Sequence, residues 1–230
     1  RCEADDIRKI ENQVREQVDN TFFQGCPLIP VSSRTGQGLN DLTKLLDDLA
    51  KKKKIRDNVG LFRLSVDRRF LLQGTGLVAT GTVSSGSIKD GDEIWLMPSK
   101  KRVKARSLRV NAKSENIAGA GDRCAINLVG SDLKLEDIGR GNWLTTNPGK
   151  PTTEASAVLK ISEEEKRNFR NLSSVHFHSA ANHMLARISL LDFSNLPPGA
   201  SCFAKIILES EINLCYGDHF LIRDQSATRT

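Results

Sequence analysis

The chain has no apolar run near the length that spans a membrane, and its first residues do not form a signal peptide. It has no starting methionine, so we expect a processed chain or a fragment. Its cysteines are odd in number and show no Cys-x-x-Cys spacing. We therefore expect reduced thiols, not disulfides or a zinc site, and a cytoplasmic location. The five cysteines are Cys2, Cys26, Cys124, Cys202 and Cys215.

The remaining composition is that of an ordinary globular protein. Hydrophobic residues make up 38% and charged residues 27% of the 230 positions, a length that suggests one to three domains. The net charge of +6 permits nucleic acid as a partner without requiring it. No Gly-x-Ser-x-Gly elbow is present, and we predict no catalytic residue.

The first zone, residues 1–54, predicts a helix, a strand and a second helix. Apolar residues recur every three or four positions between Ile7 and Val18 and again between Leu39 and Leu49, as on one face of a helix. Residues 27–31 form a short apolar run typical of a buried strand. Because one strand cannot make a sheet, we interpret this zone as the end of a doubly wound domain. A charged linker at 55–60 follows.

Beyond the linker the pattern changes to short strands separated by turn residues. In the second zone, residues 61–147, we predict strands around 62–66, 93–97, 103–110 and 124–128. In the third zone, residues 152–230, we predict strands at 154–161, 173–178, 183–191, 201–208 and 219–223. Many short strands with frequent turns favour β-barrels. We therefore expect a mostly β protein with two small barrels, the second incomplete with an open edge after Arg223.

Glycines punctuate the start of the second zone at Gly74, Gly76, Gly81 and Gly86. With β-branched and small residues between them, they predict short strands that turn sharply at the glycines. Residues 74–79 also match the dinucleotide fingerprint, which needs a helix after its glycines. The residues that follow do not favour a helix, so we assign the glycines to barrel geometry.

Two further clusters have competing interpretations. His176, His178 and His183 lie close together in sequence and could bind a metal. No carboxylate or thiol has a companion spacing, so we favour structural or surface roles and predict no metal. Residues 99–113 carry seven positive charges and no negative ones. They fit either a surface that follows an RNA backbone or an edge strand guarded against aggregation. The candidate RNA contacts are Lys100, Lys101, Arg102, Lys104 and Arg106.

The order of three segments resembles the translational GTPases of the elongation factor Tu group. Residues 31–38 resemble the last guanine-contacting loop of GTPases, with Ser32, Ser33 and Arg34 at its core. Residues 66–92 resemble the start of the second domain, which contacts the aminoacyl end of tRNA in that group. Residues 217–224 are similar to an element of the third domain. This resemblance implies that the first zone is the remnant of a P-loop GTPase domain.

Two segments, residues 62–68 and 176–191, are more narrowly similar to bacterial selenocysteine-specific elongation factors. This resemblance implies that Asp67, Arg68 and Arg123 line the pocket for the selenocysteyl group. The chemistry agrees, because a selenol is more acidic than a thiol and is largely anionic near neutral pH. Arginines in a partly dry pocket would favour that anion over a neutral seryl or cysteinyl group.

The resemblance further implies a longer parent that carries selenocysteyl-tRNA to the ribosome and hydrolyses GTP with Mg²⁺. The phosphate-binding loop, the magnesium-binding aspartate and Asn-Lys-x-Asp would precede Arg1. We thus expect this chain alone to bind no GTP, hold no cofactor and catalyse nothing. A winged-helix region that reads an mRNA hairpin would follow Thr230. Alternatives are a translational GTPase that delivers ordinary aminoacyl-tRNA, or a non-GTPase barrel module that docks on RNA or a ribosomal protein. No membrane partner is expected.

Overall fold

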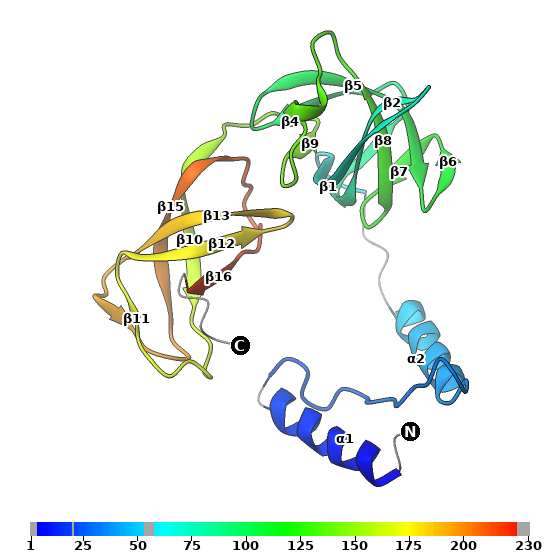
Figure 1. Cartoon of the computed structure of the whole chain (residues 1–230). Coiled ribbons are helices and arrows are strands. Elements are labelled where there is room, and N and C mark those ends of the chain that lie inside the picture. Colours follow the sequence, from blue (N-terminus) through cyan, green and yellow to red (C-terminus); the bar gives the residue numbers. More distant parts are fainter. Residues whose placement is uncertain (1–3, 20, 53–57, 225–230) are drawn as a thin grey trace. The chain divides into compact units, whose positions relative to one another are not determined.

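A computed structural model describes residues 4–19, 21–52 and 58–224 (Figure 1). The chain divides into two compact units, Arg1–Ile55 and Arg56–Thr230. Among the described residues, the α-helices lie in the first unit and the strands in the second. No helix in the described part of the chain is long and apolar enough to cross a membrane. The predicted linker at 55–60 falls partly outside the described residues, as does Cys2.

The first unit contains α1 (Ala4–Val18) and α2 (Leu39–Lys52), joined by an irregular segment. The strand predicted at residues 27–31 is wrong: these residues form no strand and are exposed or half-buried. A strand needs a hydrogen-bonded neighbour, and the described part of this unit offers none. The helices also lack cover, because α2 has no buried residue and Leu46 and Leu49 are 55% and 54% exposed.

The second unit begins with a closed barrel. Its strands are ordered β4-β9-β1-β2-β8-β5, and β5 pairs with β4 to complete the circle. β6 extends β5, β3 pairs with β7, and a short 3₁₀ helix precedes β9. The elements are β1 (Arg63–Leu72), β2 (Gly76–Ser85), β3 (Ser87–Lys89), β4 (Glu93–Met97), β5 (Lys101–Val110), β6 (Lys113–Glu115), β7 (Ile117–Gly119), β8 (Arg123–Val129), η1 (Leu135–Asp137) and β9 (Trp143–Thr145).

The glycine-rich stretch differs from the prediction of short, sharply turning strands. It forms one strand, β2, with Gly81 in its interior, and only Gly74, Gly76 and Gly86 adopt positive φ angles at its ends. A Cβ at Gly81 would lie 2.1 Å from the backbone oxygen of Ser65. Gly81 therefore allows β1 and β2 to approach closely. No helix follows residues 74–79, which confirms that they are not a dinucleotide fingerprint.

A single apolar core fills the first barrel, because alternate residues of each strand point inward. The largest of these side chains are less than 2% exposed. They include Phe62, Leu64, Ile88, Ile94, Leu96, Leu108, Ile126 and Leu144.

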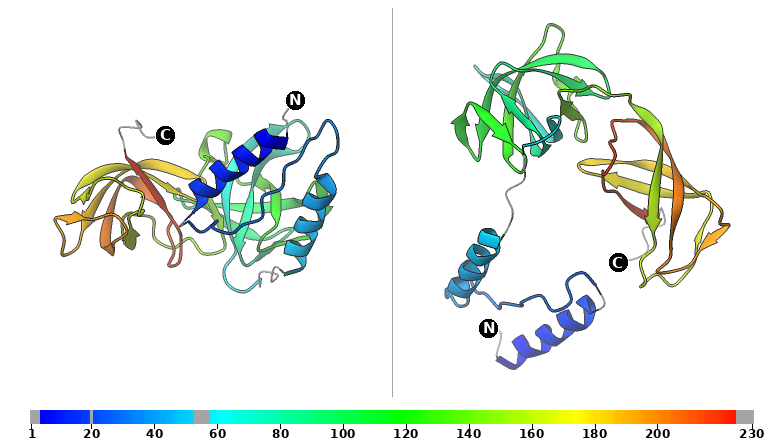
Figure 2. Two further views of the ribbon diagram at one scale, coloured as in Figure 1. Left: turned by 90° about the horizontal axis from the view of Figure 1, so that it is seen from below. Right: turned by 180° about the vertical axis from the view of Figure 1, so that it is seen from behind.

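The remainder of the second unit is a curved five-stranded sheet with the order β10-β15-β13-β12-β16 (Figure 2). Its strands are β10 (Thr152–Lys160), β12 (Ser173–Ser179), β13 (Asn182–Leu190), β15 (Ser201–Ile212) and β16 (Leu221–Asp224). The short strands β11 (Phe169–Arg170) and β14 (Asn195–Leu196) pair separately. Within the described residues β10 and β16 are edge strands, so the sheet has the open edge predicted beside Arg223.

Most strand predictions are confirmed, and the differences are local. The strand predicted at 93–97 coincides with β4, whereas β15 continues to Ile212, beyond the predicted end at 208. β16 begins at Leu221 and not at residue 219. The two-residue strands β11 and β14 were not predicted, because so short a run carries no alternation.

A half-buried ion pair joins the first barrel to the second sheet. Arg63 on β1 donates from Nη1 and Nη2 to the two carboxylate oxygens of Asp218, at 2.7 and 2.9 Å. Its guanidinium lies 4.0 Å from the ring centroid of Trp143. Nearby, the backbone N–H of Ala181 donates to Ser65 Oγ at 3.3 Å. Polar contacts thus fix this junction.

Candidate functional site

A β-bulge in β1 places Asp67 on the outside of the first barrel. Val66 pairs with Gly81 and Arg68 pairs with Thr80, so Asp67 is the extra residue between two successive pairs. A bulge changes the direction of the side chain that it carries. At this residue β1 also changes from buried to exposed positions.

Asp67 holds Arg123, which begins β8. Arg123 Nη1 forms an ion pair with Asp67 Oδ2, and Arg123 Nη2 donates to Oδ1 at 3.0 Å. Thr80 Oγ1 donates to the same Oδ1 at 2.8 Å. The side chains of Arg123 and Asp67 are 46% and 28% exposed, so water still reaches the pair. Strand closure thus joins two residues that the sequence separates widely.

The electrostatics keep both members of this pair charged. Burial raises the pKa of the Asp67 carboxyl, but hydrogen bonds from Arg123 and Thr80 and the charges of Arg123 and Arg68 outweigh that effect. The pKa of Asp67 therefore lies below its ordinary value. The hydrogen bond to Asp67 in turn raises the pKa of Arg123. The pair is close to neutral as a unit, and Arg123 keeps further N–H donors for a ligand.

Arg68 lies beside this pair and is exposed. Among the described residues, no carboxylate lies within ion-pair distance of its guanidinium. Its pairing partner, Thr80, is half-buried, as is Ala125, which pairs with Thr80 from β8. These two short side chains leave a low surface next to the charged groups.

The structure therefore brings Asp67 and Arg123 into contact and leaves Arg68 as a free cation nearby. Their role in binding a ligand stays a prediction. Thr80 was not identified from the sequence, although it orients Asp67. Its only sequence signal is its place directly before Gly81 in the glycine-rich stretch.

The basic stretch is partly neutralised within the barrel. Lys101 forms an ion pair with Asp137 at 2.6 Å, and Arg102 forms one with Glu93. The Arg102 guanidinium also lies 5.5 Å from the ring centroid of Trp95. The other predicted RNA contacts, Lys100, Lys104 and Arg106, are exposed with no carboxylate at ion-pair distance in the described part of the chain. They are the members of the set that remain available to a phosphate.

The three histidines form a stack on the second sheet. His183 lies with its ring centroid 5.0 Å from that of His176 and 4.5 Å from that of His178. His183 Nε2 is 3.0 Å from His176 Nδ1. Burial, together with the charges of His183, Arg223 and His176, lowers the pKa of His178. No group of metal-ligating side chains suited to an ion occurs among the described residues.

The predicted guanine loop closes on itself in the first unit. The backbone N–H of Ser32 donates to Gln37 O at 3.0 Å, and Ser32 Oγ accepts from the N–H of Thr35 at 3.3 Å. Ser33 and Arg34 are exposed at the turn. These contacts preform a tight loop before α2, and its role in guanine binding stays a prediction.

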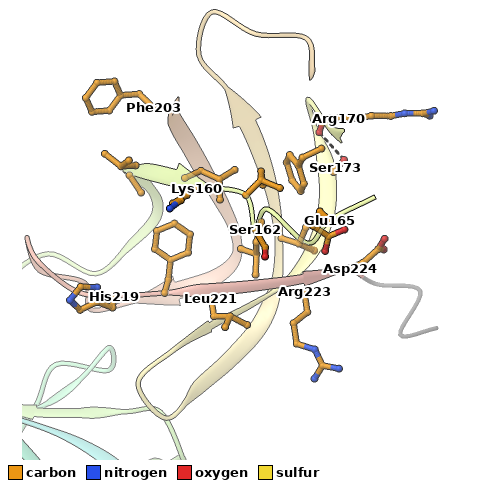
Figure 3. Close-up of a pocket in the computed structure, with 18 of the residues that line it drawn as sticks. Lys160, Ser162, Glu165, Arg170, Ser173, Phe203, His219, Leu221, Arg223 and Asp224 are labelled. Carbon is orange, nitrogen blue, oxygen red and sulfur yellow. Dashed lines mark hydrogen bonds between the residues drawn. The ribbon is translucent and has the colours of Figure 1, made fainter. Parts of the chain in front are cut away.

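A hollow lies on the open side of the five-stranded sheet, between β10 and β16 (Figure 3). Lys160, Phe203, Leu221 and Arg223 are among the residues that line it. Phe203 and Leu221 are 67% and 57% exposed there. We attribute this hollow to the unpaired edges of the sheet, and none of the predicted binding residues lines it.

The described cysteines are free thiols, and none of them lies in a metal cluster among the described residues. Cys124 is buried beside Arg123 on β8. Burial, aided by the charge of Asp122, raises the pKa of its thiol to about 12. Cys124 is therefore a core residue and not a nucleophile.

Comparison with known proteins agrees with the fold of the second unit. Residues 76–145 match the family model described as elongation factor Tu domain 2. Residues 156–230 match the model described as the β-barrel domain of the selenocysteine-specific elongation factor. The fold and these two matches thus define the paired β-barrels of an elongation factor of the Tu type.

Individual relatives indicate which family within this class the chain resembles. The selenocysteine-specific elongation factor of Desulfomicrobium baculatum is 31% identical, over 99% of this chain and 36% of its own length. That of Escherichia coli (strain K12) is 32% identical, over 97% of this chain and 34% of its own length. The structure of translation elongation factor SelB from Methanococcus maripaludis in complex with the GTP analogue GPPNHP is similar with a TM-score of 0.81. It is 25% identical, over 97% of this chain and 52% of that one.

The chain belongs to the selenocysteine-specific elongation factor family. It spans about a third of the length of each of these two curated relatives.

Proposed function

We propose that this chain is the central part of a longer selenocysteine-specific elongation factor, and that the first barrel holds the selenocysteyl group of the charged tRNA. The observation that carries the proposal is the Asp67–Arg123 pair, with Arg68 beside it, on the outer face of the barrel. Membership of the family and the family-model matches to both barrels support it.

The arrangement suits a small anion. An Arg123 guanidinium held by Asp67 presents its remaining N–H donors in a fixed orientation, so less entropy is lost on binding. Arg68 adds a cation that no protein carboxylate neutralises in the described structure. A selenolate would accept charge-assisted hydrogen bonds here, whereas a seryl hydroxyl would leave the positive charge without a counter-ion.

The remaining functions of the parent protein require parts outside this chain. We propose that GTP and Mg²⁺ bind when a phosphate-binding loop precedes the first unit, and that the turn at Ser32, Ser33 and Arg34 then contacts the guanine. The GTP analogue bound by the Methanococcus maripaludis protein supports this proposal. The 230 residues alone would then be no enzyme and hold no cofactor.

We further propose that the parent delivers selenocysteyl-tRNA to the ribosome in the cytoplasm, where translation takes place. A region after residue 230 would read the mRNA hairpin. The exposed cations Lys100, Lys104 and Arg106 are the candidates for contact with an RNA backbone in this chain.

The test is GTP-dependent delivery by the full-length protein. Binding of selenocysteyl-tRNA to ribosomes programmed with a hairpin-containing mRNA is measured with a GTP analogue and with GDP. We expect binding with the analogue, and much less with GDP or when the same tRNA carries serine. Equal delivery of the seryl form would favour a factor for ordinary aminoacyl-tRNA, and a failure to bind any charged tRNA would contradict the proposal.

A further inference from the structure

A second exposed arginine, Arg109, lies in the same cross-strand row as Arg68. Arg68 on β1 pairs with Thr80 on β2, Thr80 pairs with Ala125 on β8, and Ala125 pairs with Arg109 on β5. These four strands are neighbours in the first barrel (Figure 1). Residues paired directly across antiparallel strands project from the same face of a sheet. The whole row therefore lies on the outer face.

The middle of the row is a shallow surface between two long cationic side chains, and we call this surface, formed by Thr80 and Ala125, the floor. Thr80 and Ala125 are short and half-buried, whereas Arg68 and Arg109 at the ends of the row are exposed. Three strand spacings separate the ends, which is about 14 Å between backbones. Arg123 lies two residues from Ala125 on β8, so the Asp67–Arg123 pair borders the same floor.

Some cations of β5 have carboxylate partners, and Arg109, like Lys104 and Arg106, belongs to those that have none among the described residues. Lys101 and Arg102, at the other end of β5, are matched by Asp137 and Glu93. In the described structure no carboxylate lies within ion-pair distance of Arg109. Because Asp67 already balances Arg123, the net positive charge at the floor comes from Arg68 and Arg109.

We propose that Arg109 forms the second cationic wall of the aminoacyl site and contributes to its preference for an anionic side chain. This inference rests on the proposed function, because it takes the floor between β1 and β5 as the place of the selenocysteyl group. Arg109 is then a specificity residue on β5. The sequence pattern of this strand indicated only contact with an RNA backbone or protection of a sheet edge.

The experiment replaces Arg109 in the full-length protein. Arg109→Gln should weaken binding of selenocysteyl-tRNA about 5-fold or more, the size expected for a lost pair of charges near contact in a watery site. Binding of the same tRNA charged with serine should change less than about 2-fold. Arg109→Lys keeps the charge and should retain most of the preference.

Lys104→Gln is the matched control. Lys104 is exposed on the same strand and pairs with Val129, four residues along β8 from Ala125, which is about 13 Å along the strand. The Lys104→Gln variant removes one positive charge, as Arg109→Gln does, but outside the floor. It should therefore change the affinities for the selenocysteyl and seryl forms by the same factor.

The outcomes separate this inference from the function on which it rests. A wild-type protein that binds the two charged forms equally well would contradict the proposed function. A wild-type preference that Arg109→Gln leaves unchanged would overturn only the role of Arg109. Equal losses for both charged forms would place Arg109 on the tRNA backbone and also overturn it. Thermal unfolding of each variant is the control that checks whether the barrel remains folded.

Discussion

Removal of Arg123 should selectively weaken binding of the selenocysteyl form. In the full-length protein we expect Arg123→Ala to cost about 1.5–3 kcal/mol for selenocysteyl-tRNA, the range for hydrogen bonds to a charged group. This corresponds to roughly 10- to 150-fold in affinity. Binding of the same tRNA charged with serine should hardly change, because a hydroxyl supplies no anion to lose.

The structure adds a second component to this loss. Without Arg123 the Asp67 carboxylate keeps only the Thr80 hydroxyl as a side-chain hydrogen-bond donor in the described structure, and its charge would repel a selenolate. The magnitude should therefore lie in the upper part of the range. Adding Asp67→Asn to Arg123→Ala removes that repulsion and should recover part of the affinity, a coupling that a double-mutant cycle measures.

The assay is a pair of dissociation constants for each variant, measured with a GTP analogue and the two charged forms of one tRNA. Arg102→Ala is a control, because Arg102 has a carboxylate partner on the same barrel but lies away from the bulge. Equal losses for the two charged forms of Arg123→Ala would mean that Arg123 contacts the tRNA backbone or supports the fold. The reasoning would then be refuted.

Four further predictions concern the chain itself. Calorimetry of the 230-residue chain should detect no GTP binding in the micromolar range, and such binding would contradict the account. Hydrogen exchange should be slowest in the first barrel, from 61 to 144, and fastest in α1 and α2, because α2 has no buried residue and Ile10 of α1 is 52% exposed; uniformly slow exchange would refute this. Folding lowers the pKa of Asp67, so its carboxylate should stabilise the barrel at pH values above its ordinary pKa of 3.8. This contribution should be lost as the pH falls through the lowered pKa of the folded state. Asp67→Asn should flatten the dependence of stability on pH in this range, and an unchanged dependence would count against the ion pair. Asp218→Ala leaves Arg63 largely buried without its partner and should cost about 3 kcal/mol in urea unfolding, whereas a loss below 1 kcal/mol would show that water reaches the junction.

The sequence predicted the class of fold because its signals are local. Alternation and turn residues located β4 and most other strands, and the order of motifs indicated two barrels after a helical segment. The prediction of a strand at 27–31 was wrong, because a strand needs a hydrogen-bonded partner strand and the described part of the first unit contains none. The interior position of Gly81 was also missed, because a glycine that permits close strand approach has the same sequence signature as one in a turn.

The residues of the site were also predicted only in part, because some of its features depend on contacts between distant strands. The resemblance supplied Asp67, Arg68 and Arg123, but not the bulge that turns Asp67 outward or the hydroxyl of Thr80 that holds it. The row that joins Arg68 to Arg109 depends on the register of four strands. Register depends on packing across the barrel, so no local pattern in the sequence could reveal it.

The most direct test of the central claim is the pH dependence of the wild-type preference. Affinities of the full-length protein for the selenocysteyl and seryl forms of one tRNA are measured as the pH is lowered through the pKa of the selenol. If arginines select the selenolate, the preference should be largest near neutral pH and should shrink as the selenol becomes protonated. A preference that stays constant across that titration would contradict recognition of the anion.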